Sequence, residues 1–332
     1  MAVYTDVSDE DLVAFLADYD IGEVVSFKGI AEGVENTNYL LQTVAGDASA
    51  PQSYILTLYE KRVSPDDLPY FLGLMDHLAE NGISCPTPIH GRDGAALRKL
   101  AGRPAAIVSF MSGIWPKKST PAHCAELGAA MARMHEAGQS FDGNRPNSMS
   151  VESWEGLMEE TRDRADTVVD GLAALIAAEF EHTANLWPDD LPGGVIHADL
   201  FPDNVFFLGD RLSGLIDFYF ACNDALAYDL AICINAWCFE PDHSLNVTKA
   251  RALLRGYAGV RPITRAEYDA LPLLARGSAL RFLLTRLYDW INHDAAAYVQ
   301  HKDPKQFLGR LRFHQQVDGP GAYGVSFEDV NG

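Results

Sequence analysis

The chain is poor in cysteine, and its cysteines are not arranged in any site pattern. Five cysteines are spread over 332 residues, and no two are spaced as a CxxC pair. The sequence therefore indicates neither a disulfide framework nor a zinc site, and we expect buried, reduced thiols. The first ten residues, MAVYTDVSDE, lack a basic-then-apolar signal pattern, and no apolar run reaches the ~18 residues that span a bilayer. These absences predict a cytoplasmic protein.

Positive charge is also scarce. The sequence has 26 Lys and Arg against 46 Asp and Glu, a formal net charge of −20. A surface of this sign repels phosphate backbones and anionic lipid, so neither nucleic acid nor a membrane surface is expected as a partner. A small-molecule substrate is expected instead. The sequence leaves the oligomeric state open between a monomer and a weak dimer.

The pattern of the chain predicts an α+β fold in two lobes. A length of 332 residues exceeds one ordinary core. Short strand-like segments with two helices fill residues 1–112, and long helical patterns dominate residues 113–332. We therefore predict a small strand-rich lobe, followed by a larger helical lobe. Helices are expected at 121–137, 153–185, 226–238, 245–257, 265–293 and 304–313.

One short block interrupts the helical half and contains the most specific motif. His197, Asp199 and Asn204 form H-x-D-x-x-x-x-N, and Asp217 follows Asn204 by thirteen residues. Four fixed residue types at fixed offsets are rare by chance. The alternative is a polar turn in an ordinary helical protein.

The residues between Asn204 and Asp217 predict a β-hairpin. Apolar runs at 205–208 and 212–216 flank Gly209-Asp210-Arg211. A turn centred on Asp210 and Arg211 would place Asn204 directly opposite Asp217, with Cβ atoms roughly 5 Å apart. An amide oxygen and a carboxylate held in this way can share one Mg²⁺ with substrate phosphates.

Asp199 lies on the loop that enters this hairpin. A carboxylate there can accept the proton of an attacking hydroxyl beside a metal-bound phosphate. Phosphoryl transfer needs mainly positioning and charge stabilisation, so this set is sufficient for a kinase that uses ATP and Mg²⁺. Asp199 is the predicted catalytic base.

The block from 193 to 231 resembles the catalytic and metal loops of the protein-kinase and aminoglycoside-phosphotransferase superfamily. The resemblance implies a bilobal protein-kinase-like fold, with a small antiparallel-sheet N-terminal lobe (1–112) that binds nucleotide and a larger helical lobe (113–332) for catalysis and substrate. It also implies Asp199 as base and Asn204 and Asp217 as Mg²⁺ ligands. It makes His197 an orienting residue of the catalytic loop. Asp229 matches a family aspartate that braces this loop, so structural support is its expected role.

The nucleotide-binding half departs from the family pattern. Thr57 stands where a strand lysine usually contacts the phosphates, and Lys61 or Arg62 would have to reach back. The loop at 29–38 has two glycines and a polar run that permit close approach of phosphate, although a simple hairpin loop has the same features. A nucleotide-binding pseudokinase is the alternative that these departures raise. The nucleotide contacts expected from the resemblance are Gly29, Gly33, Asn36, Asn38, Lys61, Phe110 and Met111.

Several phrases resemble the homoserine kinases of the aminoglycoside-phosphotransferase type. They are GVENTNY at 33–39, YILTLYEKR at 54–62, FLGLMDHLAENG at 71–82, IDFYF at 216–220, NAWCF at 235–239 and RFLLTRLYDW at 281–290. The resemblance implies that ATP and L-homoserine give O-phospho-L-homoserine in threonine biosynthesis. Choline, methylthioribose or an aminoglycoside remain alternative acceptors.

An amino-acid acceptor requires a cation for its carboxylate. Arg281 and Tyr288 lie on a polar stripe of the apolar helix 265–293, and this stripe could line a cleft or simply face solvent. Arg281 is the expected carboxylate ligand. Tyr288 and Tyr219 are expected to line the acceptor site.

Overall fold

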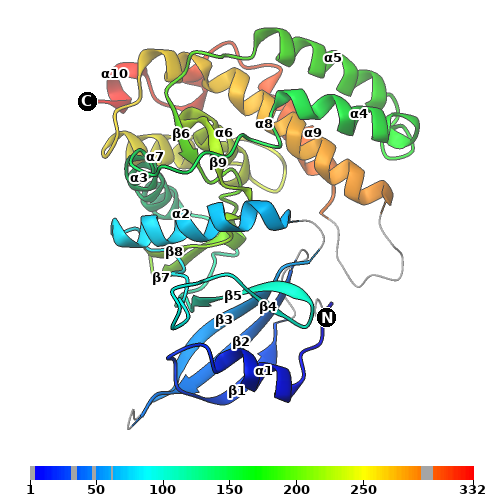
Figure 1. Cartoon of the computed structure of the whole chain (residues 1–332). Helices are drawn as coiled ribbons and strands as arrows, with labels where there is room; N and C mark the ends of the chain where they lie inside the picture. Colours follow the sequence, from blue (N-terminus) through cyan, green and yellow to red (C-terminus); the bar gives the residue numbers. More distant parts are fainter. Residues whose placement is uncertain (1–3, 31–35, 47–49, 61–62, 293–301) are drawn as a thin grey trace. The chain divides into compact units, whose positions relative to one another are not determined.

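The computed structural model describes residues 4–30, 36–46, 50–60, 63–292 and 302–332. The chain separates into two compact units, Met1–Ser112 (unit 1) and Gly113–Gly332 (unit 2) (Figure 1). A five-stranded antiparallel sheet in unit 1 and many helices in unit 2 confirm the predicted α+β class. All five cysteines are buried and free, as expected.

Unit 1 is built on one antiparallel sheet with strand order β1-β2-β3-β5-β4. The alternating apolar pattern of the central strands explains the arrangement, since every second residue of β2 is buried. The strands are β1 (Glu23–Gly29), β2 (Thr37–Val44), β3 (Gln52–Leu58), β4 (Arg98–Leu100) and β5 (Arg103–Ser109). Residues 87–90 contribute only a single bridge, between Pro88 and Val108, because prolines at 86 and 88 cannot donate to a ladder.

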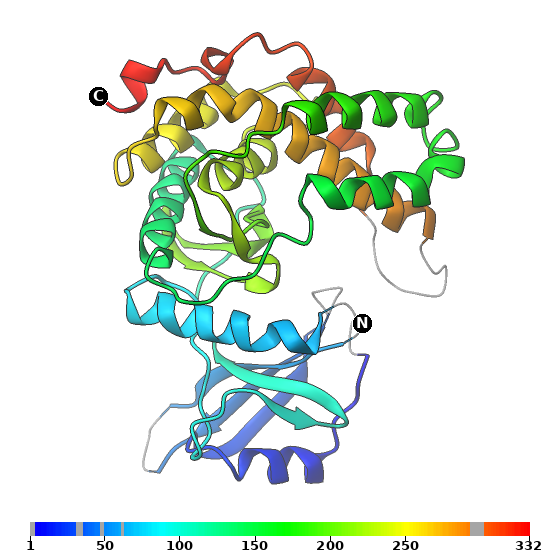
Figure 2. The ribbon, with the colours of Figure 1, turned by 45° about the horizontal axis from the view of Figure 1, so that its top comes forward.

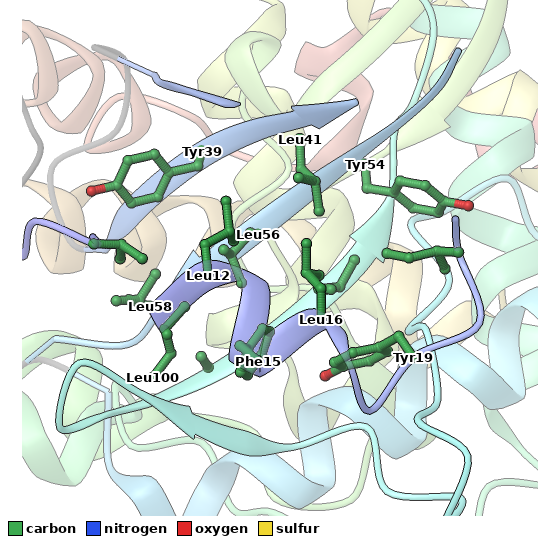
Figure 3. Packing of buried hydrophobic residues seen from close by; sticks show 14 residues of the cluster. Leu12, Phe15, Leu16, Tyr19, Tyr39, Leu41, Tyr54, Leu56, Leu58 and Leu100 are labelled. Atoms are coloured by element: carbon green, nitrogen blue, oxygen red, sulfur yellow. The ribbon is translucent and has the colours of Figure 1, made fainter. Parts of the chain in front are cut away.

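The first helix of unit 1, α1 (Asp9–Leu16), packs its apolar side onto the sheet. Ser8 caps the helix by accepting the backbone N–H of Asp11 at 3.1 Å. Figure 3 shows Leu12 and Phe15 of α1 among the aromatic and aliphatic side chains of the strands. Burial of each such side chain contributes about 1.5–3 kcal/mol, so this cluster stabilises unit 1. A short 3₁₀ turn, η1 (Pro65–Asp67), leads into α2 (Leu68–Glu80).

Unit 2 is mainly helical. Its helices are α3 (Pro121–Gly138), α4 (Val151–Ala165), α5 (Leu172–Leu186), α6 (Leu226–Trp237), α7 (Val247–Ala258), α8 (Arg265–Asn292), α9 (Lys305–His314) and α10 (Phe327–Val330). The single helix predicted at 153–185 is wrong: α4 and α5 are separate and lie side by side in Figures 1 and 2. Gly171, at φ 72°, adopts the left-handed conformation that starts α5 after the turn.

Glycines bring α3 and α7 unusually close together. A Cβ on Gly128 would lie 2.1 Å from the carbonyl oxygen of Leu253, and one on Gly256 would lie 2.2 Å from that of Ala125. Only glycine fits at such backbone contacts. The close crossing matters for the site below, because both helices contribute to one buried polar network.

Two short two-stranded antiparallel sheets interrupt the helices. β6 (Gly193–Ile196) pairs with β9 (Cys222–Ala225), and β7 (Val205–Leu208) pairs with β8 (Arg211–Leu215). Short 3₁₀ turns, η2 (Pro202–Asn204), η3 (Phe218–Phe220) and η4 (Pro320–Tyr323), complete unit 2. Among the described residues, no helix is both long and apolar enough to cross a membrane.

Candidate active site

The loop after β6 carries Asp199 and is held in a strained backbone conformation. Ala198 has φ 62°, which is uncommon for a residue with a Cβ. Strain of this kind is of order 1–3 kcal/mol and persists only where surrounding contacts impose it. The carboxylate of Asp229 provides those contacts, since it accepts the N–H groups of His197 and Ala198, each at 2.8 Å.

Asp229 belongs to a buried network that begins at the loop and ends between α7 and α8. His135 of α3 lies 3.0 Å from the carboxylate through Nε2 and 2.8 Å from the hydroxyl of Tyr257 through Nδ1. Arg261 donates to the Tyr257 oxygen at 3.1 Å and to Glu267 at 2.9 Å. The Tyr257 oxygen accepts from Arg261, so its own proton is free to be donated to Nδ1 of His135. With Nδ1 as an acceptor, the neutral ring carries its proton on Nε2 and donates it to Asp229.

This network also sets the charge of Asp229. Burial acts to raise the pKa of that carboxyl, but the hydrogen bonds from His135 and the loop N–H groups outweigh it, and the pKa lies below its ordinary value. Asp229 is therefore a buried carboxylate that stays ionised. An ionised acceptor makes stronger hydrogen bonds to the loop than a neutral one would.

His197 joins the catalytic loop to the segment that carries Asp217. Its Nε2 lies 3.0 Å from the carbonyl oxygen of Ile216, and its ring packs on Phe218 with centroids 4.6 Å apart. Burial lowers the pKa of His197, so the ring is a neutral donor. This position is suited to the orienting role implied by the family resemblance.

The predicted register of the hairpin is wrong by one residue at its open end. The turn is Gly209-Asp210, closed by the pair Leu208 and Arg211, and a bulge follows at Phe206 and Phe207. Gly209, at φ 65°, supplies the left-handed conformation that a two-residue turn favours, so the turn is centred one position earlier than expected. Asn204 consequently pairs with Ile216, whose N–H donates to the Asn204 carbonyl at 3.0 Å.

Asp199, Asn204 and Asp217 nevertheless gather at the same place. The amide Nδ2 of Asn204 donates to the carbonyl oxygen of Asp199 at 2.8 Å and to its carboxylate at 3.1 Å. Asp217 leaves the strand at φ 67° and acts electrostatically on Asp199. Burial raises the pKa of Asp199 to about 8; the positive charge of Arg281 opposes this rise, and the negative charge of Asp217 adds to it.

The donor set suits a hard cation that is shared with phosphate. The described residues contain no group of three or more His, Cys, Asp or Glu side chains that could hold a metal by themselves. Mg²⁺, however, is often bound by one or two protein oxygens together with substrate phosphates and water. Since Nδ2 of Asn204 is used by Asp199, its Oδ1 is the atom suited to a cation, with the carboxylate of Asp217 as the second ligand. A cation there would lower the raised pKa of Asp199.

The nucleotide contacts predicted in unit 1 are only partly described. Gly33 and Lys61 lie outside the described residues, and Gly29 ends β1. Asn36 accepts the N–H of Glu60 at 3.2 Å, and Asn38 accepts the hydroxyl of Thr57 at 2.8 Å. These two side chains hold strand ends together, and their role toward a nucleotide stays a prediction.

The end of β5 and the predicted acceptor residues have different surroundings. Phe110 is exposed and Met111 is partly exposed, just beyond the strand. Tyr219 and Tyr288 are partly exposed in unit 2. Arg281 is only 3% exposed and donates to the carbonyl oxygen of Ala198 at 2.9 Å, so its contacts favour positioning the catalytic loop.

Sequence reasoning assigned no role in the site to four residues that the structure brings near the loop. His135 and Tyr257 stabilise Asp229 from helices distant in the sequence, and no local pattern marks them. Arg286 and Arg310 surround an aromatic ring close to the loop. For Arg286 and Arg310 the sequence offered one indication: each is a basic residue among the apolar positions of a helix, where charged side chains are uncommon.

Comparison with known proteins agrees with this geometry. Residues 26–263 match the model of the phosphotransferase enzyme family. The homoserine kinase of Bradyrhizobium sp. (strain ORS 278) is 62% identical over 98% of this chain and 99% of its own length. That of Paramagnetospirillum magneticum is 61% identical over 98% of this chain and 100% of its own. The solved structure of amicoumacin kinase hAmiN has the same fold, with a TM-score of 0.69 at 13% identity over 97% of this chain and 96% of that one.

Proposed function

We propose that this chain, which belongs to the phosphotransferase enzyme family, acts as an ATP-dependent homoserine kinase. It transfers the γ-phosphoryl group of ATP to the hydroxyl of L-homoserine and gives O-phospho-L-homoserine, a step of threonine biosynthesis. The main support is the likeness to curated homoserine kinases along nearly the whole chain. The arrangement of Asp199, Asn204 and Asp217 supports the same chemistry independently.

Asp199 is the proposed base, and it accepts the proton of the homoserine hydroxyl as that oxygen attacks the γ-phosphorus. Asn204 orients the carboxylate through its Nδ2 hydrogen bond. Arg281 and Asp229 fix the loop backbone on either side of the strained residue Ala198. These contacts hold the base in one orientation before substrate binds, which is the main contribution a protein makes to phosphoryl transfer.

Asn204 and Asp217 are the residues proposed to hold Mg²⁺. When bound there, the ion neutralises charge on the phosphate oxygens. Gly29, Asn36, Asn38, Phe110 and Met111, together with Gly33 and Lys61, remain the proposed nucleotide contacts of unit 1. Tyr219 and Tyr288 remain the proposed lining of the acceptor site.

Replacement of the base tests the mechanism. We expect Asp199→Asn to lower kcat by about 10²–10⁴-fold, because the amide cannot accept the hydroxyl proton. ATP binding, measured by calorimetry with Mg·ATP, should persist. Undiminished turnover in Asp199→Asn would give another residue the role of base, whereas absence of turnover in the wild-type protein, with Mg·ATP still bound, would favour the pseudokinase class.

A panel of acceptors tests the substrate. Coupled ADP detection with L-homoserine, choline and methylthioribose, run with and without EDTA, should give turnover with homoserine that EDTA abolishes. Turnover of choline in place of homoserine would reject the proposed acceptor while retaining the kinase chemistry. EDTA-resistant turnover would reject the proposed metal dependence.

A further inference from the structure

Two arginines of unit 2 lie against one buried aromatic ring. Arg286 comes from α8, and Arg310 and Phe307 come from α9. Each guanidinium carbon lies 4.4 Å from the ring centroid of Phe307, within the range of a cation–π contact. Arg286 and Arg310 are called the arginine cluster below.

Neither guanidinium of the cluster has a carboxylate partner among the described residues. Nε and Nη1 of Arg310 are buried without any hydrogen-bond partner there, and Arg286 donates only to the amide oxygen of Gln306, at 2.9 Å. Arg261 and Arg276, elsewhere in unit 2, each pair with a buried glutamate, at 2.9 and 2.6 Å. The arginine cluster therefore differs from these two ion-paired arginines, in a chain with a net charge of −20.

Because neither arginine makes an ion pair with a described carboxylate, the cluster is an electrostatically favourable site for an anion. Burial lowers the pKa of both arginines to about 10; the negative charges of Asp203, Asp199 and Asp303 oppose the shift at Arg286, and the like charge of Arg286 adds to the shift at Arg310. Both groups remain charged at neutral pH. Two desolvated like charges that make no close ion pair repel each other, and a bound anion offsets that repulsion and supplies acceptors for the unmet donors.

The cluster lies close to the catalytic loop. Arg286 is 5.9 Å from the ring centroid of Phe201, and that ring belongs to a residue two positions after Asp199. Lys302 also lies over the Phe201 ring, at 5.4 Å, but its ammonium is paired with Asp203 at 2.9 Å. Arg286, in contrast, makes no close ion pair within the described part of the chain, although the charges of Asp199 and Asp203 act on it.

We propose that Arg286 and Arg310 bind the α-carboxylate of L-homoserine while its hydroxyl reaches Asp199. The inference rests on the proposed function and identifies how that site selects an amino acid over a simple alcohol. Only a short carbon chain separates the hydroxyl and the carboxylate of homoserine. Guanidinium groups present paired donors that match a carboxylate. Arg281, the carboxylate ligand expected from sequence, instead uses its Nη1 on the Ala198 carbonyl.

The test compares two acceptors in variants that lose the guanidinium group. Arg286→Met and Arg310→Met remove the charge and keep an unbranched, apolar side chain beside Phe307. With L-homoserine, kcat/KM should fall on the order of 100-fold, mainly through KM, because a charged hydrogen-bonded contact is lost. With 3-amino-1-propanol, which lacks the carboxylate, the same variants should retain wild-type kcat/KM. Calorimetric binding of L-homoserine to the folded variants should weaken to the same extent.

Arg265→Met is the matched control, because Arg265 also stacks on an aromatic ring, 5.3 Å from the Phe327 centroid, and lies at the exposed start of α8. It should leave both acceptors unaffected. An equal loss with both acceptors would assign the cluster a structural role and overturn the proposal. A rise in the KM for ATP alone would assign it to nucleotide phosphates, and would also overturn it. Absence of homoserine turnover in the wild-type protein would instead reject the proposed function itself.

Discussion

The described part of unit 2 contains two buried histidine–tyrosine pairs with nearly the same geometry. In one, Nδ1 of His135 lies 2.8 Å from the hydroxyl of Tyr257; in the other, Nδ1 of His314 lies 3.0 Å from that of Tyr323. The pairs differ in the group that faces Nε2. His135 faces the carboxylate of Asp229, and His314 faces the amide oxygen of Asn235, both at 3.0 Å.

This difference separates a pair that supports the site from one that supports the scaffold. The carboxylate of Asp229 also accepts hydrogen bonds from two N–H groups of the catalytic loop, so the first pair is connected to that loop. Asn235 instead donates its amide to the carbonyl oxygen of Ala275 at 2.7 Å, which joins α6 to α8. The two pairs are thus natural controls for each other, since similar losses of packing and hydrogen bonding should have different effects on turnover.

The largest effect is expected when the carboxylate of the first pair becomes an amide. In Asp229→Asn the loop N–H groups and His135 compete for a single oxygen, and unmet buried donors cost about 1–3 kcal/mol each. We expect the free energy of unfolding to fall by about 2–4 kcal/mol and kcat to fall on the order of 100-fold. Urea unfolding and steady-state kinetics of the folded fraction measure the two quantities.

Asp224→Asn is the control for that variant. Burial raises the pKa of Asp224, whereas the pKa of Asp229 is lowered, so loss of the negative charge should cost less at Asp224 than at Asp229. Asp224 also lies outside the catalytic loop, at the end of β9, where it accepts from Asn147 at 2.7 Å. Near-wild-type turnover is expected, and an equal loss in both variants would remove the special role assigned to Asp229.

The second pair should make stability depend on pH. Burial lowers the pKa of His314 to about 3, whereas an unfolded histidine titrates near pH 6.5. Between these values the unfolded chain binds a proton that the folded chain does not, so stability is full above about pH 6.5 and falls as pH decreases. The free energy of unfolding should drop by about 2 kcal/mol from pH 6.5 to pH 5 through this group. Denaturant titrations at several pH values should show a slope reduced by about one proton in His314→Gln, and an unchanged slope would contradict the assignment.

The catalytic block could be predicted because it is local. His197, Asp199, Asn204 and Asp217 lie within one short segment, and a hairpin brings its ends together whatever the rest of the chain does. The register could not be predicted to the residue, since the turn at Gly209 and the bulge at Phe206 and Phe207 each shift the pairing. The fold class followed in the same way from strand and helix periodicity.

The residues that support the catalytic loop could not be predicted, because they are distant from it in the sequence. His135 is 94 positions from Asp229, and Tyr257 is 122 positions from His135. Their meeting depends on the crossing of α3 and α7 at Gly128 and Gly256, which is a tertiary contact without a local sequence signature. Thr57 illustrates another limit, because a hydroxyl in place of the family lysine is used to bind Asn38 within the sheet.

Removal of the tyrosine hydroxyl of each histidine–tyrosine pair should have the smallest effect on turnover, but it distinguishes the two pairs best. Tyr257→Phe and Tyr323→Phe each remove one buried hydroxyl, and each should lower the free energy of unfolding by about 1–2 kcal/mol. Only Tyr257→Phe also frees Nδ1 of the histidine that faces Asp229, so it alone should reduce kcat, by roughly tenfold, without changing the KM for ATP or homoserine. Kinetics normalised to folded protein, with urea unfolding of both variants, measure the contrast. If both variants lose turnover equally, or neither loses any, the polar network behind Asp229 stabilises the fold without positioning the catalytic loop.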